Sequence, residues 1–317
     1  MGRLVDGIWQ DVWYDTAASG GAFVRADSTF RGSVTSDGSS GFPVEPGRYH
    51  LFVAYACPWA HRALIMRALK QLDAAVSASF VSPVMLDQGW HFDEAPEPVL
   101  GTQYLHQVYT MAEPGFSGRV TVPVLWDKVR RTIVNNESSE IIRILNGPLG
   151  VLGDDRHDYY PEDLRPSIDA LNQRIYDAVN NGVYKAGFAT AQPVYEAACA
   201  ALFRMLDELD RLLATRRWLM GDRLTEADIR LFTTLVRFDA VYYGHFKCNL
   251  RHVYEYEHLW GFVRDLYQTP GVAGTVRLDE IKRHYYFSHA MINPNRIVPM
   301  GPLLDFTTPH GRERLAP

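Results

Sequence analysis

The stretch YHLFVAYACPWAHR, residues 49–62, places a strand signal directly before a helix signal. Residues 49–55 are rich in aromatic and β-branched side chains, which favour a short β-strand. Pro58 stands where proline is favoured, in a first helical turn, and apolar residues continue at helical spacing from Trp59 to Leu72. The stretch therefore predicts a strand and then a helix that begins immediately after Cys57.

Further strand signals and a second helix follow on the C-terminal side. A second β-like run covers 76–86, and a third, at 121–126, is followed so closely by 131–135 that the two predict a hairpin. Apolar residues at helical spacing predict a helix over 137–145. The order is β-α-β, a polar insertion at 87–118 with room for one helix, and then β-β-α. An insertion of this length is longer than a typical connection and more often has a functional role.

From Pro166 onward the strand signals end and helical periodicity dominates. The predicted helices cover 167–185, 194–214, 226–245, 259–268 and 272–287. Thr225 and Asp228 match a capping box at the start of the third of these helices, which gives Asp228 a structural role. These segments predict a second, all-helical domain.

The order of these signals divides the chain into five parts. Residues 1–45 show no sustained periodicity, are rich in Gly, Ser and Asp near 33–41, and are expected to form an extended arm. After the arm we expect a mixed α/β domain over 46–147, a linker over 148–165, the all-helical domain over 166–290 and a tail over 291–317. A chain of 317 residues exceeds the usual size of one hydrophobic core, which favours two domains.

Composition and charge argue against several kinds of partner. The formal net charge of −5 gives no general attraction for nucleic acid or for an anionic membrane. No apolar run approaches the roughly 20 residues that cross a bilayer, and the N-terminus lacks an apolar signal core. We therefore expect a cytoplasmic protein that binds neither nucleic acid nor membrane.

The three cysteines, Cys57, Cys199 and Cys248, are odd in number and far apart in the chain. This pattern argues against a disulfide framework and against a Cys-x-x-Cys metal site, and it fits thiols in a reducing compartment. Cys199 and Cys248 lie in segments that favour burial as small apolar residues. The histidines show no metal-ligand spacing, so no metal is expected.

Several short motifs together resemble one family. They are residues 55–62 with the Cys-Pro-Trp-Ala element, 89–90, 121–127, 136–138, 180–189 and 293–294. This set resembles the glutathione transferase superfamily and, more narrowly, the glutathionyl-hydroquinone reductases, also called Xi-class glutathione transferases. A Cys-Pro-x-Ala element alone would also fit omega-class transferases and glutaredoxin-like domains. The resemblance implies a thioredoxin-like α/β N-terminal domain and an all-α C-terminal domain, which is the glutathione transferase fold.

Cys57 is the predicted nucleophile. A thiol attacks sulfur only as the thiolate, and the N–H groups and positive macrodipole end of a helix N-terminus favour that form. The alternative is that Cys57 is an N-cap residue without a chemical role. Because residue 60 is alanine, no neighbouring thiol can resolve a mixed disulfide on Cys57, so a second glutathione must do so.

The resemblance implies that glutathione is the co-substrate and that Val122-Pro123 binds it. A cis peptide bond there would turn the Val122 main chain toward the cysteinyl part of glutathione, whereas the plain alternative is a proline on an edge strand. Glu137 and Ser138 would hold the γ-glutamyl end, and without the resemblance they are simply good first-turn residues.

Trp90 and Arg119 complete the implied glutathione site. By resemblance Trp90 packs on glutathione. Arg119 either pairs with the glycyl carboxylate or is solvated before a strand, and the sequence leaves both alternatives open.

Reduction of a glutathionyl-hydroquinone needs one group that attacks sulfur and another that protonates the ring carbon. By resemblance Tyr184 is the proton donor, and Tyr242 and Tyr285 donate hydrogen bonds to the Cys57 thiolate. Core packing is the commoner role for any one of these tyrosines. The predicted products are free hydroquinone and, after a second glutathione reacts, oxidised glutathione.

Two other functions share parts of this pattern. An omega-like thiol transferase or dehydroascorbate reductase would use the same cysteine on small disulfide-like substrates. A catalytically silent transferase-like module would serve protein assembly instead. The resemblance also implies a homodimer formed through helical residues around 192–200, with aromatic glutathionyl-hydroquinones as substrates.

Overall fold

The structure is a computed structural model that describes residues 2–93 and 96–315. The described chain divides into two compact units. The first comprises residues 2–13, 26–157 and 279–284, and the second comprises 14–25, 158–278 and 285–315. The change of unit between residues 157 and 158 lies within the stretch predicted to be a linker.

The core of the first unit is a four-stranded sheet in the order β4-β3-β6-β7. Its strands are β3 (Tyr49–Val53), β4 (Ser77–Phe80), β6 (Val124–Asp127) and β7 (Thr132–Asn135). β3 and β4 are parallel, while β6 pairs antiparallel with both β3 and β7. Every residue of β3 and β6 is buried, in line with their central places in the sheet. The predicted strands and the predicted hairpin are confirmed, except that the strand predicted over 76–86 is shorter and ends at Phe80.

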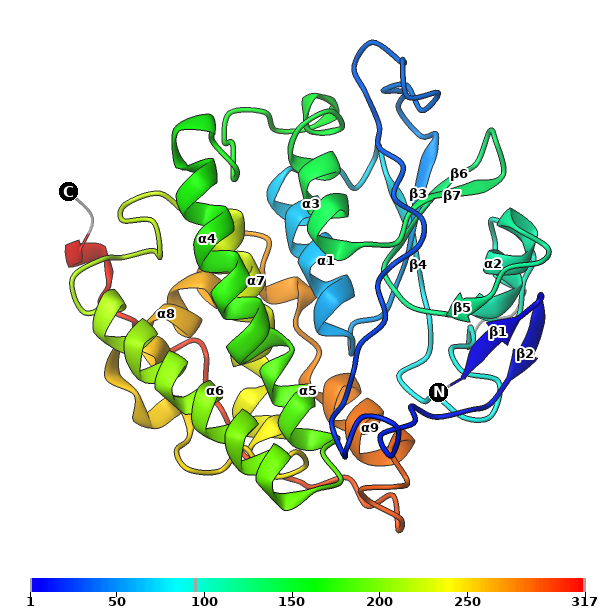
Figure 1. Cartoon of the computed structure of the whole chain (residues 1–317). Helices are drawn as coiled ribbons and strands as arrows, with labels where there is room; N and C mark the ends of the chain where they lie inside the picture. Colours follow the sequence, from blue (N-terminus) through cyan, green and yellow to red (C-terminus); the bar gives the residue numbers. More distant parts are fainter. Residues whose placement is uncertain (1, 94–95, 316–317) are drawn as a thin grey trace. The chain divides into compact units, whose positions relative to one another are not determined.

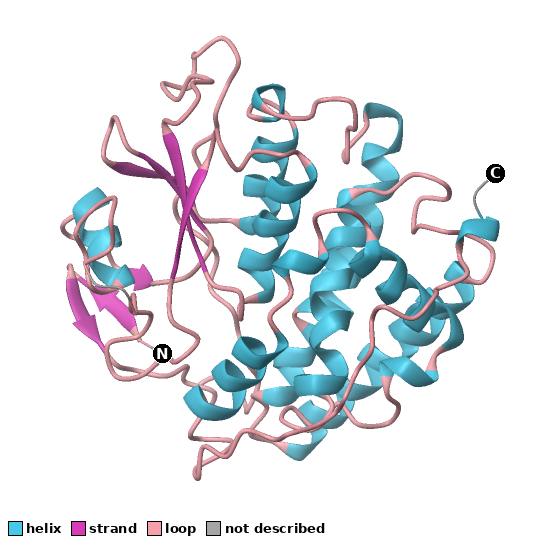
Figure 2. Ribbon diagram, turned by 180° about the vertical axis from the view of Figure 1, so that it is seen from behind, coloured by secondary structure: helices cyan, strands magenta, loops and turns pink. Residues whose placement is uncertain are grey.

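Helices cover both faces of this sheet. α1 (Pro58–Leu69) and α3 (Ser138–Asn146) pack together on one face, and α2 (Leu105–Ala112) lies on the other (Figures 1 and 2). α2 occupies the predicted insertion at 87–118. α1 ends before the predicted end at Leu72, because Gln71 adopts a left-handed backbone conformation with a φ of +53°. The arrangement is the thioredoxin-like one that the resemblance implies.

A second, three-stranded sheet belongs to the same unit. It contains β1 (Arg3–Val5), β2 (Ile8–Gln10) and β5 (Gly118–Arg119) in the order β2-β1-β5. The sequence predicted an extended arm or loop here and did not predict the strands β1 and β2. Such short strands leave no periodicity to detect. The turn between β1 and β2 requires Gly7, whose φ is +78° and whose added Cβ would lie 2.0 Å from the Pro114 carbonyl oxygen.

The rest of the arm is divided between the units. Within the first unit, Gly32 N–H donates to Val134 O at 2.9 Å, so the chain here runs beside β7. Within the second unit, the segment 14–25 is fixed by Thr190, whose N–H donates to Gly21 O at 3.0 Å. The arm is therefore not a separate part of the molecule.

The second unit is helical, as predicted. Its helices are α4 (Arg165–Ile175), α5 (Gly182–Gly187), α6 (Gln192–Leu213), α7 (Glu226–Arg237), α8 (Glu257–Gln268) and α9 (Leu278–Ser288), of which α9 contributes residues 279–284 to the first unit. Short 3₁₀ turns along the chain cover Gly150–Leu152, Glu162–Leu164, Val253–Glu255, Ala273–Thr275 and Glu313–Leu315.

Two of the predicted helices contain π-helical turns. Tyr176–Asn180 lies between α4 and α5, and Phe238–Tyr242 extends α7. The predicted continuous helix over 167–185 is thus interrupted. Asn180 supports the interruption, because its side-chain amide donates to Arg230 O at 2.9 Å and to Thr234 Oγ1 at 2.7 Å. π-Helical turns are frequent at functional sites.

α7 begins with the predicted capping box, which is confirmed. The Thr225 N–H donates to Asp228 Oδ2 at 2.8 Å, and the Leu219 N–H donates to Asp228 Oδ1 at 2.8 Å. Asp228 is fully buried, so these bonds satisfy a carboxylate that water does not reach. Its role here is structural.

Cys199 and Cys248 are buried, which confirms the expectation for these two thiols. None of the three cysteines forms a disulfide within the described residues. In the part of the chain that the structure describes, no helix is both long and apolar enough to cross a membrane.

Candidate functional site

Cys57 occupies the N-cap position of α1, directly after the turn that follows β3. Its backbone is extended, Pro58 lies in the first helical turn, and that turn carries no acidic residue. The N–H groups and the positive dipole end of α1 therefore favour a thiolate at this position. The side chain is 9% exposed, and Sγ donates to the Val122 carbonyl oxygen at 3.6 Å.

The Val122–Pro123 peptide bond is cis, as predicted. The residue before it, Thr121, is held by the Tyr109 hydroxyl, which donates to Thr121 O at 2.8 Å and accepts from Thr121 N at 3.2 Å. This contact fixes the main chain that leads into β6. The structure thereby brings the main chain of Val122 next to the Cys57 sulfur, where an extended peptide bound to Val122 would also meet the thiol.

Glu137 and Ser138 lie at the start of α3. The Glu137 carboxylate accepts from Ser139 N at 2.9 Å and from Ser28 Oγ at 3.1 Å. Burial raises the pKa of Glu137, but hydrogen bonds from Ser139 and the charge of Arg62 lower it by more, so it lies below the ordinary value of a glutamate. The carboxylate is therefore charged at neutral pH and able to accept from an ammonium group. The α3 N–H groups beside it suit a carboxylate.

Arg62 is a residue that the sequence did not single out. Its side chain is almost fully buried, Nη1 donates to Ser138 Oγ at 3.3 Å, and the guanidinium lies 4.5 Å from the centre of the Trp59 ring. A buried guanidinium here adds positive charge beside Glu137 and Ser138. The available signal was an arginine inside a helix whose neighbouring positions are mostly apolar.

Trp90 and Arg119 also belong to the first unit. Trp90 is buried and stacks on His284, with ring centres 4.8 Å apart, and His284 Nδ1 lies 2.8 Å from the Pro83 carbonyl oxygen. Arg119 is in β5 and donates from Nη1 to Val12 O at 2.5 Å. Arg119 therefore binds the N-terminal segment, and its pairing with a glycyl carboxylate stays a prediction.

The predicted tyrosines form one cluster in the second unit. Tyr184 comes from α5, Tyr242 from the π-helical turn after α7 and Tyr285 from α9, and all three are buried. Tyr285 is central, because its hydroxyl lies 2.5 Å from that of Tyr184 and 3.0 Å from that of Tyr242. Burial raises the pKa of Tyr242 and of Tyr285 well above 10. Both hydroxyls therefore stay protonated at neutral pH, while their bonds to the Cys57 thiolate stay a prediction.

Close packing around Tyr184 explains part of the 180–189 motif. The Phe246 ring lies 5.5 Å from the Tyr184 ring, and a Cβ on Gly187 would come within 2.2 Å of Phe246. Only glycine at this position allows the aromatic ring to approach. His245 and His289 also contact the Phe246 ring, and His245 Nε2 and His289 Nδ1 lie 3.2 Å apart.

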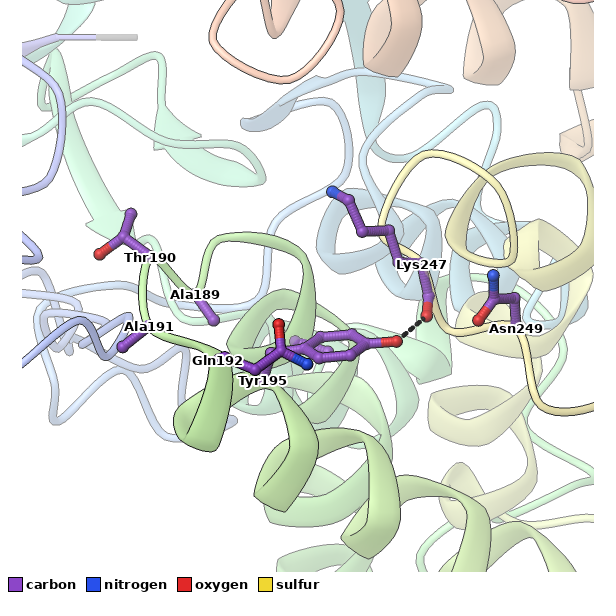
Figure 3. A pocket seen from close by; sticks show the side chains of 8 residues that line it. Ala189, Thr190, Ala191, Gln192, Tyr195, Lys247 and Asn249 are labelled. Atoms are coloured by element: carbon purple, nitrogen blue, oxygen red, sulfur yellow. Dashed lines mark hydrogen bonds between the residues drawn. The ribbon is translucent and has the colours of Figure 1, made fainter.

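A separate pocket of about 370 Å³ lies in the second unit, between the end of α5, the start of α6 and residues 247–249. Figure 3 shows Tyr195 at this pocket, where its hydroxyl donates to Lys247 O at 2.7 Å. Thr190, Gln192 and Asn249 contribute polar groups. The predicted site residues do not line this pocket. Among the residues with described positions, no group of three His, Cys, Asp or Glu side chains could hold a metal ion.

Comparison with known families matches both parts of the chain. A family model described as "Glutathione S-transferase, N-terminal domain" matches residues 56–147. A second, described as "Glutathione S-transferase, C-terminal domain", matches residues 192–265. The two matches cover the thioredoxin-like region and much of the helical region.

Individual relatives are similar over nearly the full length. The chain is 52% identical to glutathionyl-hydroquinone reductase YqjG of Escherichia coli, with 99% of each chain covered. It is 55% identical to glutathionyl-hydroquinone reductase PcpF of Sphingobium chlorophenolicum, over 95% of this chain and 96% of that protein.

Solved structures agree. The glutathione-bound structure of YqjG has a TM-score of 0.90 at 49% identity and covers 98% of this chain and 99% of its own. A Xi-class glutathione transferase from Natrialba magadii has a TM-score of 0.93 at 48% identity and covers 100% of this chain and 98% of its own. The chain therefore belongs to the glutathione transferase family, within its Xi class of glutathionyl-hydroquinone reductases.

Proposed function

We propose that this protein is a glutathione-dependent reductase that removes glutathione from glutathionyl-hydroquinones, with Cys57 as the nucleophile. The observation that carries the proposal is the position of Cys57 at the N-terminus of α1, with its sulfur beside the Val122 main chain. The relatives named glutathionyl-hydroquinone reductase, more than half identical over nearly the whole chain, support the same activity.

In the first half-reaction the Cys57 thiolate attacks the sulfur of the glutathionyl group. A disulfide forms between Cys57 and glutathione, and the bond from sulfur to the aromatic carbon breaks. The carbon keeps both electrons of that bond and takes a proton from Tyr184. The hydroxyl of Tyr285, 2.5 Å from that of Tyr184, can replace the proton. Free hydroquinone is the product.

In the second half-reaction Cys57 leaves the mixed disulfide as a thiolate, displaced by a second molecule of glutathione. The sulfur of the second glutathione bonds to the glutathione sulfur that leaves Cys57, and the two molecules together form oxidised glutathione. The position at the α1 N-terminus stabilises the departing thiolate, as it stabilises the attacking one. No proton has to be delivered to carbon in this step, so Tyr184 has no role in it.

The proposed glutathione site lies around Cys57 in the first unit. The Val122 main chain binds the cysteinyl part, and Glu137 and Ser138 bind the γ-glutamyl end. Support comes from the charged state of Glu137 and from Ser138 at the start of α3. Trp90 packs on glutathione and Arg119 takes its glycyl carboxylate. Pro123 sets the direction of the Val122 main chain.

A homodimer and a cytoplasmic location complete the proposal. The second half-reaction consumes reduced glutathione, which a reducing compartment supplies. For the dimer, residues 192–200 at the start of α6 offer exposed positions, among them Gln192, Pro193 and Ala197. Light scattering of the purified protein measures the oligomeric state directly, and a monomeric mass would remove this part of the proposal.

Turnover of a defined glutathionyl-hydroquinone tests the function. Wild type should release hydroquinone, Cys57→Ala should be inactive, and Tyr184→Phe should be slowed by roughly two to four orders of magnitude, the usual effect of a general acid. Faster turnover of a simple glutathione mixed disulfide than of the hydroquinone would favour an omega-like transferase. Absence of a Cys57 adduct after incubation with oxidised glutathione would favour a silent module.

A further inference from the structure

Arg25, in the segment 14–25 of the N-terminal arm, lies over the ring of Tyr184. Its guanidinium carbon is 4.8 Å from the centre of that ring. Its Nε donates to Asn181 Oδ1 at 3.0 Å, and Asn181 is the N-cap residue of α5, the helix that carries Tyr184. All of these residues belong to the second unit. A cation therefore rests on the face of the proposed proton donor.

Contacts at Thr16 and Gly21 hold the arm a few residues before Arg25. Thr190 N–H donates to Gly21 O at 3.0 Å, and the hydroxyls of Thr190 and Thr16 lie 3.1 Å apart. Gly21 has a φ of +89°, and a Cβ there would lie 2.6 Å from Ala191 Cβ, so only glycine permits this approach. The chain is thus anchored at the connection between α5 and α6, just before it reaches Arg25.

Phe23 adds packing between the anchor and Arg25. Its ring lies 5.2 Å from that of Phe188 and 6.4 Å from that of Tyr184, and the Arg25 guanidinium lies 5.2 Å from the Phe23 ring. Phe23 is buried. The arm therefore contributes an aromatic side chain and a cation to the surroundings of Tyr184.

We propose that Arg25 is a positioning residue for the proton donor Tyr184 in the release of hydroquinone. This inference rests on the proposed function. A cation on the ring face holds the ring in place and stabilises the negative charge that grows on the phenol oxygen as the proton leaves. Among the described residues, the titratable side chains of Tyr242 and Tyr285 also lie next to Tyr184. Burial raises the pKa of both, and the charge of Arg237 lowers it by less.

The two half-reactions separate this role from general stability, because only the first needs a proton on carbon. Release of hydroquinone in a single turnover reports the first step. Reduction of a preformed Cys57–glutathione disulfide by glutathione reports the second. Arg25→Gln keeps a long polar side chain that can still bond Asn181 but removes the charge. It should slow the first step about tenfold and leave the second unchanged.

Arg25→Lys and Arg165→Gln are the matched variants. Lysine restores the charge, so Arg25→Lys should recover most of the rate of the first step. Arg165 lies over the Tyr160 ring at 5.2 Å in the same unit, and it is not part of the tyrosine cluster. Arg165→Gln therefore removes a comparable contact and should leave both steps at the wild-type rate.

A double variant decides whether Arg25 acts through Tyr184. In a Tyr184→Phe background, Arg25→Gln should add no further slowing, because the group that it assists is gone. Additive slowing, equal slowing of both half-reactions, or a wild-type first step in Arg25→Gln would each overturn the inference. A wild-type first step in Tyr184→Phe would instead show that the proposed role of Tyr184 fails.

Discussion

Glu137 joins two functions in one side chain. It caps α3 through Ser139, and in the proposed site it also binds the ammonium of glutathione. Hydrogen bonds from Ser139 and the charge of Arg62 hold the pKa of Glu137 below that of an ordinary glutamate, which favours the charged carboxylate. The positive charge of Arg62, which is buried beside Ser138, stabilises the ionised form of Glu137. Glutathione binding should therefore depend on this carboxylate more than on any other acidic residue of α3.

Glu137→Gln should raise the KM for glutathione about tenfold or more, with little change in the single-turnover release of hydroquinone. The reason is the loss of a charge-assisted hydrogen bond, worth roughly 1.5–3 kcal/mol. Steady-state kinetics with glutathione as the varied substrate provide the measurement. Glu140→Gln is the matched control, since Glu140 lies one turn further along α3 and pairs with Arg31. An equal rise in KM for both variants would contradict the assignment.

The tyrosine cluster predicts an order of effects. The hydroxyl of Tyr285 lies 2.5 Å from that of Tyr184, the proposed proton donor, and 3.0 Å from that of Tyr242. Tyr285→Phe should therefore slow hydroquinone release more than Tyr242→Phe, by a factor of roughly five to ten. Rapid-quench measurement of one turnover compares the variants. The account fails at this point if Tyr242→Phe has the larger effect.

At the scale of elements, the caps and turns fix where each helix presents its functional end. α7 depends on its capping box, in which the Thr225 hydroxyl lies 3.0 Å from Asp228 Oδ2 and both residues are fully buried. The π-helical turn that carries Tyr242 follows α7 directly. Stability of this cap is thus linked to the placement of the tyrosine cluster.

Thr225→Ala should lower the free energy of unfolding by about 1–2 kcal/mol, the usual effect of losing an N-cap. Chemical denaturation followed by circular dichroism measures it. Thr29→Ala, at an exposed position, should change the stability by less than about 0.5 kcal/mol and serves as control. A loss no greater than that of the control would mean that the capping box contributes nothing.

The sequence predicted those elements whose signals are local. The β3–α1 junction, the hairpin and the capping box each depend on residues close together in the chain, and all three are confirmed. The sequence did not predict the strands β1 and β2, because they are too short to show an alternation of apolar and polar residues. The sequence did not predict the interruption before α5, because it depends on hydrogen bonds from the Asn180 side chain to Arg230 and Thr234, which are distant in the chain.

At the scale of the whole molecule, the sequence predicts only part of the proposed site, because some of its contacts join residues that are distant in the chain. The sequence motifs assign both Cys57 and Val122 to the glutathione site, and in the structure Cys57 Sγ lies 3.6 Å from the Val122 carbonyl oxygen. No motif linked Arg25 to Asn181, because 156 residues separate them in the chain. Such contacts come from tertiary packing, and periodicity or local spacing does not report them.

The stability of the first unit should depend on pH through Asp127. Asp127 is fully buried at the end of β6 and accepts from Arg48 Nη2 at 2.6 Å. Burial raises the pKa of Asp127, but the hydrogen bonds from Arg48 lower it by more, so it lies below the ordinary value of an aspartate. A carboxylate whose pKa is lower in the folded than in the unfolded protein stabilises the fold. This stabilisation is fully present at pH values above the pKa of the unfolded state, and it is lost as the pH falls through the pKa of the folded state.

Wild type should therefore lose stability as the pH falls below about 4, and Asp127→Asn should lose less over that window. At pH 7 the same variant should be less stable by about 3 kcal/mol, because Arg48 then lacks its buried partner. Urea denaturation at several pH values gives both numbers. A variant with the wild-type pH dependence would exclude Asp127 as the group that titrates.

The central claim concerns Cys57, and one experiment tests it most directly. A glutathionyl-hydroquinone is mixed with excess enzyme in the absence of free glutathione, and the protein is analysed by mass spectrometry of its peptides. The account predicts one glutathione on the peptide that contains Cys57, with an equivalent amount of free hydroquinone, and neither product from Cys57→Ser. Release of hydroquinone without that adduct, or release by Cys57→Ser, would contradict it.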